Sequence, residues 1–409
     1  MSEWQKITFG EAVNFPPKCS LVKKEVYPYI ELANINIGFK YVYSFGEQKY
    51  NGSGSKFENG DTLFARITPS LENGKIAQVK NLKKTGFGSG EFFIFRGKKG
   101  ISDSDFIYYL SQTESFKNNA INSMVGASGR QRADNKFVAK TKINLPPLPT
   151  QQKIAKILSN YDDLIENNLK RIKLLEESAR LTYEEWFLRF RIDGKKLDID
   201  PESGLPFGWE KKSITQCDAF KQDNRKLKEF DGEKLYYATA DVDGTEITVD
   251  GEIIKWLNKP SRAQIKPNNN TVWFARMSNT YKVLCFNNKN TNLQDSSVLS
   301  SGFAGFNAKN DSCLPFLYFT INSKFFHDLK DLYATGATQV SLNNDSMSYI
   351  KIIEPRSELI EKFGNKTLPL IEEISNLRSK NQLLKEARDI LLPRLMTGMI
   401  DTDKLKVAA

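Results

Sequence analysis

The sequence predicts an α+β protein in which two similar globular domains are joined by two long antiparallel helices, as a pseudo-two-fold internal repeat. Three observations predict this fold. The chain of 409 residues matches itself at an offset of about 205 to 210 residues, too long for a solenoid. Each half begins with short aromatic and β-branched runs, typical of strands, and continues after prolines as a long amphipathic helical pattern.

The internal repeat keeps its order along the chain. The matching segments are Trp4-Gln5-Lys6 with Trp209-Glu210-Lys211, 29–35 with 236–242, Phe64-Ala65-Arg66 with Phe274-Ala275-Arg276, 106–109 with 316–319, and Gln131 with Gln339. The predicted boundaries are a first domain over 1–147, a first helix over 148–190, a linker over 191–207, a second domain over 208–355, and a second helix with its tail over 356–400.

Within each globular domain the pattern changes from strands to helix. Strands are expected at 75–79 and 91–95, and the glycine-rich run 86–90 is expected to be a turn. A helix is expected near 104–119, with its counterpart near 314–331.

The two long helices carry apolar side chains three and four residues apart. Thr150 is the expected N-cap of the first, which should extend for about 38 residues. Gly364 and Pro369 are expected to break the second helix into a short piece from about 357 and a long piece over 368–396. The apolar stripes are expected to pair antiparallel, because a seam of this length needs a partner. The alternative is that each helix packs only on its own domain.

Composition narrows the function classes. The net charge is +10, and residues 1–150 hold 21 basic against 13 acidic side chains, which is compatible with phosphate contacts although solubility alone also explains it. No apolar run approaches the ~20 residues that span a membrane. The four scattered cysteines and the single histidine, His327, indicate a reducing, cytoplasmic setting without a structural zinc site.

Catalytic motifs are missing from the sequence. There is no Asn/Asp-Pro-Pro-aromatic segment, no Gly-x4-Gly-Lys-Ser/Thr phosphate loop, and no histidine triad. His327 is interpreted as a packed or surface helix position. We therefore expect no enzyme activity, no cofactor and no metal, although a nuclease of weak signature stays open.

The chain resembles the specificity (S) subunit of type I restriction-modification systems. The residues that carry the resemblance are Leu-Pro-Pro-Leu-Pro-Thr-Gln-Gln at 145–152, Gly-Leu-Pro-Phe-Gly-Trp-Glu at 204–210 and Leu-Leu-Pro-Arg-Leu-Met-Thr-Gly at 391–398. The resemblance implies that the globular domains are target-recognition domains for a bipartite, asymmetric double-stranded DNA target. It also implies two adenine-methyltransferase (M) subunits as partners, and restriction/translocase (R) subunits that join through the M–S complex.

The repeat and the resemblance together select candidate contact residues. Arginine or lysine can bind guanine, and glutamine or asparagine adenine. The candidates for DNA are Arg66, Lys75, Arg130, Gln131, Arg132, Arg276, Lys282, Thr338, Gln339 and Asn343. The candidates for partner binding on the helices are Ile165, Ile172, Leu175, Leu377, Leu384 and Leu391.

Less specific explanations remain open at this point. The arginines could be salt-bridged at strand ends, and the loops could be ordinary turns. The whole chain could be a scaffold that does not recognise sequence, or a recognition chain with its own nuclease or methyltransferase activity.

Overall fold

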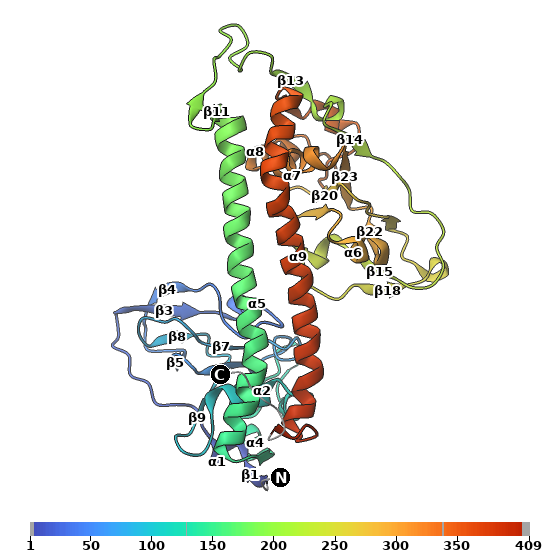
Figure 1. Ribbon diagram of the computed structural model, residues 1–409. Helices are drawn as coiled ribbons and strands as arrows, with labels where there is room; N and C mark the ends of the chain where they lie inside the picture. Colours follow the sequence, from blue (N-terminus) through green and yellow to red (C-terminus); the bar gives the residue numbers. More distant parts are fainter. Residues whose placement is uncertain (1–3, 128, 338, 403–409) are drawn as a thin grey trace. The chain divides into compact units, whose positions relative to one another are not determined.

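The computed structural model describes residues 4–127, 129–337 and 339–402. It divides into two compact units: unit 1 comprises Met1–Asn167 with Asn381–Ala409, and unit 2 comprises Asn168–Lys380 (Figure 1). Each unit therefore holds one globular domain together with a segment of each long helix.

The globular domain of unit 1 contains three small sheets. The strands are β1 (Gln5–Thr8), β2 (Val13–Asn14), β3 (Val26–Ile30), β4 (Gly46–Lys49), β5 (Ser55–Phe57), β6 (Thr62–Ala65), β7 (Ile76–Gln78), β8 (Gly86–Gly88), β9 (Phe92–Gly97) and β10 (Lys142–Leu145). Their orders are β2-β9-β6-β7, β4-β3-β8-β5 and β1-β10. All neighbours are antiparallel except β3 and β8.

The domain of unit 2 has the same topology. Its corresponding strands are β13 (Glu210–Ser213), β14 (Phe220–Asp223), β15 (Lys234–Tyr237), β18 (Glu252–Ile254), β19 (Ala263–Ile265), β20 (Thr271–Ala275), β21 (Val283–Phe286), β22 (Ser297–Ser300), β23 (Phe303–Ala308) and β24 (Lys351–Glu354). The orders β14-β23-β20-β21, β18-β15-β22-β19 and β13-β24 repeat those of unit 1, including the single parallel pair, β15 with β22. The internal repeat is confirmed.

Unit 2 also has elements of its own. These are the hairpin β16 (Val242–Asp243) with β17 (Glu246–Ile247), the helix α6 (Thr291–Ser296), and the pair β11 (Arg191–Ile192) with β12 (Lys195–Lys196).

The helices of the two domains correct one expectation. The shorter helices are α1 (Phe9–Ala12), α2 (Ser104–Gln112), α3 (Glu114–Asn122), α4 (Asn135–Lys140), α7 (Leu314–Ile321) and α8 (Lys324–Leu332). The single helix expected near 104–119 is wrong, because Thr113 adopts an extended conformation and its hydroxyl caps α3 by accepting from the amide of Phe116. Ser323 caps α8 in the same way in unit 2. Each expected helix is therefore a helix pair.

The glycine-rich run 86–90 is also not simply a turn, because its first three residues form strand β8. A Cβ atom at Gly88 would lie 2.1 Å from the carbonyl oxygen of Ile30. Glycine therefore allows β8 to lie against the parallel strand β3.

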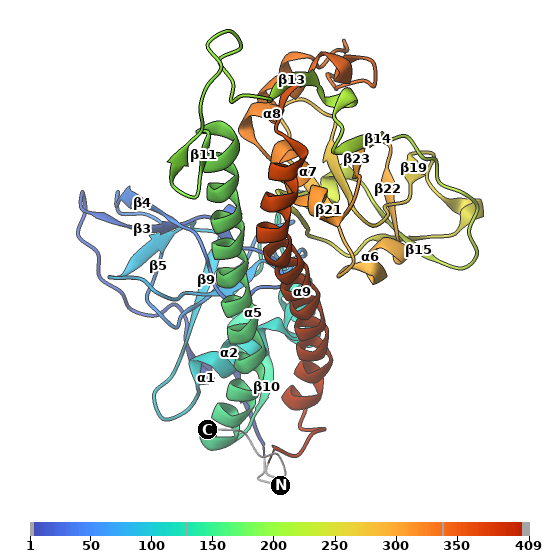
Figure 2. The ribbon, with the colours of Figure 1, turned by 45° about the horizontal axis from the view of Figure 1, so that its top comes forward.

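The two long helices are α5 (Leu148–Tyr183), which continues as one π-helical turn at Glu184–Leu188, and α9 (Ser357–Met396). In unit 1, Leu158 of α5 and Leu395 of α9 share a core with Phe106 of the globular domain. In unit 2, Ile172 of α5 packs with Leu377 of α9. The first part of α5 thus pairs with the last part of α9, and the later part of α5 pairs with an earlier part of α9. The expected antiparallel pairing is confirmed. Figure 2 shows the paired segments within each unit.

The predicted break in α9 is wrong, because the helix is continuous from Ser357 to Met396. A Cβ atom at Gly364 would lie 1.8 Å from the carbonyl oxygen of Ser312. Gly364 therefore serves close packing of the helix on its domain and does not end it. The predicted N-cap at Thr150 is also corrected: α5 begins at Leu148, and Pro149 lies in the first turn, where a missing N–H costs no hydrogen bond.

Candidate nucleic-acid interface

Each domain carries a short hairpin that follows the second helix of its helix pair. In unit 1 Val125 bridges Arg132, and Arg132 also bridges Ile67 at the end of β6. In unit 2 Thr335 bridges Ser341, and Ser341 bridges Met277 beyond β20. We call residues 125–132 the unit 1 hairpin and 335–341 the unit 2 hairpin; Ser128 and Thr338 lie outside the described residues.

The two hairpins are anchored to their sheets by the same backbone hydrogen bonds. The amide of Thr68 donates to Gln131 O at 3.0 Å, and in unit 2 the amide of Ser278 donates to Val340 O at 2.9 Å. The next contacts also correspond, Ala133 N to Arg66 O at 2.8 Å and Leu342 N to Arg276 O at 2.9 Å.

These bonds correct the residue pairing taken from the sequence. The structural counterpart of Gln131 is Val340, not Gln339, because the unit 2 hairpin is one residue shorter. The glycine at the start of each hairpin has a positive φ. A Cβ atom added to it would lie 3.2 Å from Arg130 O in unit 1 and 2.4 Å from Gln339 O in unit 2. Gln339 therefore corresponds to Arg130.

Two side chains of the hairpins are exposed and make no bond with the described part of their own domain. Arg130 and Gln339 are exposed, and neither side chain makes a hydrogen bond or ion pair with any described residue. Gln131 is half-buried and likewise makes no side-chain bond in the described part of the chain. Asn343 instead caps the turn that follows, since its Oδ1 accepts from Ser346 N at 2.7 Å and its Nδ2 donates to Thr335 Oγ1 at 3.3 Å. Thr338, the remaining hairpin candidate, lies outside the described residues.

Arg132 is an ion-paired arginine. Its guanidinium donates to both carboxylate oxygens of Glu91 at 2.6 to 3.0 Å. Hydrogen bonding to Glu91 raises the pKa of Arg132. In unit 2 this pair has no counterpart, because Ser341 replaces Arg132 and Gly302 replaces Glu91 in the same backbone bonds.

Arg66 and Arg276 occupy equivalent backbone positions but have different surroundings. The Arg66 guanidinium lies 4.7 Å from the centre of the Phe93 ring, and its Nε has no hydrogen-bond partner among the described residues. Arg276 donates from Nε to Phe303 O at 3.0 Å and from Nη2 to Asn344 Oδ1 at 2.8 Å. Burial lowers the pKa of Arg276. Arg276 thus fastens the chain that leaves the unit 2 hairpin, and the geometry favours a structural role for it.

Lys75 and Lys282 have the same structural role in the two domains. Lys75 Nζ donates to Leu32 O at 2.8 Å, and Lys282 Nζ donates to Thr239 O at 2.8 Å. The two acceptors are the first residues of the 3-10 turns that follow β3 and β15. Each lysine therefore ties a strand hairpin to the neighbouring turn.

Of the side chains selected for partner binding, Ile172, Leu175 and Leu377 belong to one apolar cluster of α5 and α9, and Leu391 packs against the core of unit 1. Ile165, Ile172 and Leu377 are 0 to 3% exposed, and Leu175, Leu384 and Leu391 are half-buried. The three buried side chains are therefore not a surface that a partner can reach. The exposed apolar side chains of the helices are Leu164, Leu174, Leu181, Leu188, Leu383 and Ile390. The seven-residue spacing of Leu174, Leu181 and Leu188 was the signal that could have revealed them.

An ionic cluster, buried in unit 1 and half-buried in unit 2, connects each domain to both helices, and no sequence pattern indicated either cluster. In unit 1, Arg388 of α9 donates to Asp162 of α5 at 2.5 Å and to Gly38 O at 3.2 Å, while Tyr109 also donates to Asp162. Burial raises the pKa of Asp162, and Arg388 opposes that rise.

In unit 2 a similar cluster also pairs an arginine of α9 with an acidic residue of α5, but its other members differ. Arg378 of α9 pairs with Glu176 of α5 at 2.8 Å, donates to Thr245 Oγ1 at 2.7 Å and pairs with Glu246 at 3.2 Å. In both units the arginine comes from α9 and the acid from α5, so each cluster joins the two helices to the segment that follows the strand β3 or β15.

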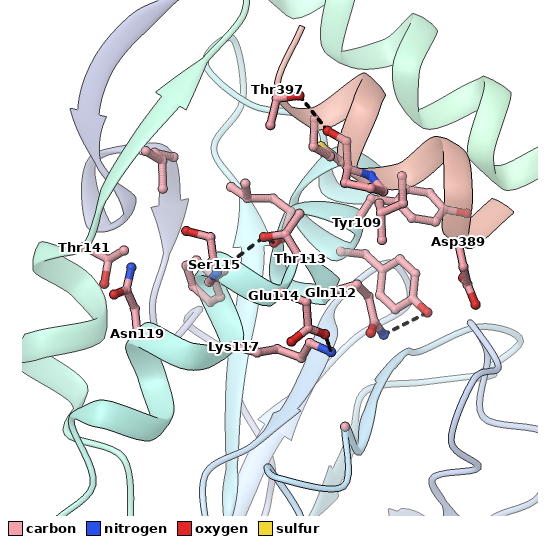
Figure 3. Close-up of a pocket in the computed structure, with 18 of the residues that line it drawn as sticks. Tyr109, Gln112, Thr113, Glu114, Ser115, Lys117, Asn119, Thr141, Asp389 and Thr397 are labelled. Atoms are coloured by element: carbon pink, nitrogen blue, oxygen red, sulfur yellow. Dashed lines mark hydrogen bonds and ion pairs between the residues drawn. The ribbon is translucent and has the colours of Figure 1, made fainter. Parts of the chain in front are cut away.

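A cavity of about 690 Å³ lies in unit 1, away from the hairpin. Figure 3 shows its lining by α2, α3 and the end of α9. Two pairs of its polar side chains bind each other, Lys117 with Glu114 at 2.5 Å and Gln112 with the Tyr108 hydroxyl at 3.2 Å. Within the described part of the chain, no group of three His, Cys, Asp or Glu side chains is arranged to hold a metal ion.

His327 is packed, as expected. It is 1% exposed in α8, its ring lies 4.5 Å from that of Tyr281, and neither ring nitrogen has a hydrogen-bond partner in the described ranges. Burial lowers the pKa of His327 to about 4.

Comparison with known proteins finds sequences that are similar to this chain. Residues 1–177 match the family model of the type I restriction modification DNA specificity domain. The chain is 25% identical to the type I restriction enzyme HindI specificity subunit of Haemophilus influenzae, over 98% of this chain and 100% of that protein. It is 26% identical to the MjaIX specificity subunit of Methanocaldococcus jannaschii, over 92% of this chain and 86% of that protein.

A solved structure has a similar fold. The crystal structure of the type I restriction-modification system S subunit from M. genitalium aligns with a TM-score of 0.56 and 15% identity, over 96% of each chain. Among the described residues, no helix is both long enough and apolar enough to cross a membrane.

Proposed function

The chain belongs to the specificity subunits of type I restriction-modification systems, the non-catalytic components that recognise the DNA target, and we propose that it recognises a bipartite, asymmetric double-stranded sequence. The observation that carries the proposal is the repeated topology with different hairpins. Two domains of one fold suit two half-sites, and different side chains on equivalent hairpins suit two different half-site sequences.

The proposal extends to the partners. The chain would direct two methyltransferase subunits, and restriction subunits through them, to the recognised site in the cytoplasm. The exposed leucines of α5 are the surface that we propose for a methyltransferase subunit, because Leu174 and Leu181 are 70% and 42% exposed and lie on one helix face.

Selection from a random duplex pool tests the DNA part of the proposal. The complex of this chain with its methyltransferase subunits should enrich duplexes with two different half-sites at one fixed separation. A scaffold that does not recognise sequence would enrich nothing, and its binding would depend only on salt. The chain alone, assayed with Mg²⁺ or with S-adenosylmethionine, should neither cut nor methylate DNA; activity in that assay would favour the bifunctional alternative.

Co-purification tests the partner surface. Leu174→Glu combined with Leu181→Glu should abolish binding of a methyltransferase subunit without unfolding the chain, because both side chains are exposed. Leu257→Glu is the matched control, since Leu257 is 97% exposed and lies in the globular domain of unit 2. If the double variant and the Leu257→Glu control lose binding equally, or if neither loses binding, the proposed partner surface is wrong.

A further inference from the structure

We propose that Arg130 and Gln339 occupy the same base-contacting position in the two domains, and that they select guanine in one half-site and adenine in the other. The proposal rests on the proposed function and deepens it: it names one specificity-determining residue in each domain. The pairing is visible only in the structure, because the sequences of the two hairpins align one residue out of register.

The first argument is the shared anchoring of the two hairpins. Each is held at its end by an antiparallel bridge, and each is anchored by two backbone hydrogen bonds to the segment beyond the central strand. A glycine with φ of +128° or +133° begins the turn in both cases, at Gly126 and Gly336. The same backbone frame therefore presents Arg130 and Gln339.

The second argument is that the base of each hairpin is fixed to the domain. In unit 2 the fully buried Lys330 donates to Met277 O at 2.8 Å, and the carboxylate of Asp331 accepts from Asn279 N at 3.0 Å. In unit 1 the bidentate pair of Arg132 with Glu91 joins the hairpin to the start of β9. A side chain on a fixed support loses less conformational freedom when it binds, which favours selective contacts.

The third argument is elimination among the polar side chains near the hairpins. Arg132, Arg276 and Asn343 are engaged in bonds within their own domain. Gln131 makes no side-chain hydrogen bond either but is half-buried, and the half-buried Arg66 guanidinium lies against the Phe93 ring. Arg130 and Gln339 are exposed and make no side-chain hydrogen bond or ion pair within the described ranges, so their donors and acceptors are available to a ligand.

The fourth argument is the chemistry of the two side chains. The guanidinium of arginine can donate two parallel hydrogen bonds to O6 and N7 of guanine in the major groove. The carboxamide of glutamine can accept from N6 and donate to N7 of adenine. The difference between the two hairpins is therefore a difference in the base that each can bind with two hydrogen bonds.

A reciprocal exchange tests the proposal in the assembled complex. Arg130→Gln should change one base pair of one half-site from G·C to A·T, and Gln339→Arg should make the opposite change in the other half-site. The preference at the affected position should shift by about five- to 150-fold, and the other half-site should stay the same. The measurement is selection from a random duplex pool with each variant.

Lys136→Gln is the matched control, because Lys136 is exposed on the neighbouring helix α4 and its replacement removes the same charge. It should leave both half-sites unchanged. If Arg130→Gln weakens binding to all duplexes equally and lowers the salt dependence by about one ion, Arg130 contacts a phosphate and the proposal is overturned. An unchanged motif in both exchange variants would overturn it as well.

The wild-type complex separates this proposal from the proposed function. If the wild type selects a bipartite motif and the variants do not alter it, only the residue assignment fails. If the wild type itself selects no bipartite motif, the proposed function fails first. Thermal unfolding of each variant should match that of the wild type, since both side chains are exposed.

Discussion

Replacement of Arg388 by methionine should destabilise unit 1 strongly. Arg388 is 7% exposed and Asp162 is 3% exposed, and the arginine is 2.5 Å from the carboxylate and 3.2 Å from Gly38 O. Methionine fills similar volume but leaves Asp162 buried without its counter-charge. Removal of one partner from a buried ion pair costs about 3 to 5 kcal/mol, a large part of a typical folding free energy of about 5 to 15 kcal/mol.

The loss should depend on pH in a defined direction. Burial raises the pKa of Asp162, and Arg388 is the largest opposing cause. Without Arg388 the pKa of Asp162 in the folded state rises further, so the carboxyl group of the variant takes up a proton at higher pH than that of the wild type. A neutral carboxyl needs no counter-charge. The stability deficit of Arg388→Met should therefore be largest at neutral and higher pH and should shrink as the pH falls into the acidic range.

Urea unfolding at several pH values measures this deficit. Arg394→Met is the control, because Arg394 is exposed on the same helix. The double variant Asp162→Leu with Arg388→Met should be more stable than Arg388→Met alone, since no unpaired charge remains. The reasoning is refuted if the Arg388 and Arg394 variants lose equal stability, or if the deficit of Arg388→Met grows as the pH falls.

Three further predictions concern unit 2. Because the pKa of His327 is lowered from its ordinary 6.5 to about 4, the unfolded state binds the proton more tightly, and up to about 3 kcal/mol of stability should be lost as the pH falls from about 6.5 to about 4. His327→Phe should remove that dependence on pH. Urea unfolding midpoints of the wild type and of His327→Phe, measured across this pH range, test it. If both proteins lose stability equally as the pH falls, the idea is wrong. Gly364→Ala should destabilise the chain by about 2 kcal/mol or more although alanine favours helix by about 1 kcal/mol, because its Cβ would lie 1.8 Å from Ser312 O; a gain in melting temperature would contradict this. Leu377→Asp, at 0% exposure, should unfold the helix pair as judged by circular dichroism, whereas Leu383→Asp, at 64% exposure, should not.

The sequence predicted the architecture because an internal repeat and the periodicity of apolar residues can both be recognised along the chain without knowledge of its tertiary contacts. The matched segments around Phe64 and Phe274 lie on equivalent central strands, β6 and β20. The helical pattern after the prolines became α5 and α9. The break expected at Gly364 failed because a glycine that ends a helix and a glycine that permits close packing look alike until the neighbouring Ser312 is placed.

The candidate site was less predictable, because exposure and pairing depend on tertiary contacts. The sequence could select Arg132 and Arg276 by their type, but not the Glu91 carboxylate or the carbonyl oxygens that engage them. It also could not show that one fewer residue in the unit 2 hairpin aligns Gln339 with Arg130.

Single-molecule methylation mapping with an exchanged domain tests the central claim most directly. Cells that carry the complete system are mapped with this chain, and again after residues 1–147 are replaced by the corresponding region of a relative. We predict a bipartite adenine-methylation motif in which the exchange alters one half-site only, while the second half-site and its separation are retained. A continuous motif, or a simultaneous change in both half-sites, would contradict the claim that the two domains recognise DNA separately.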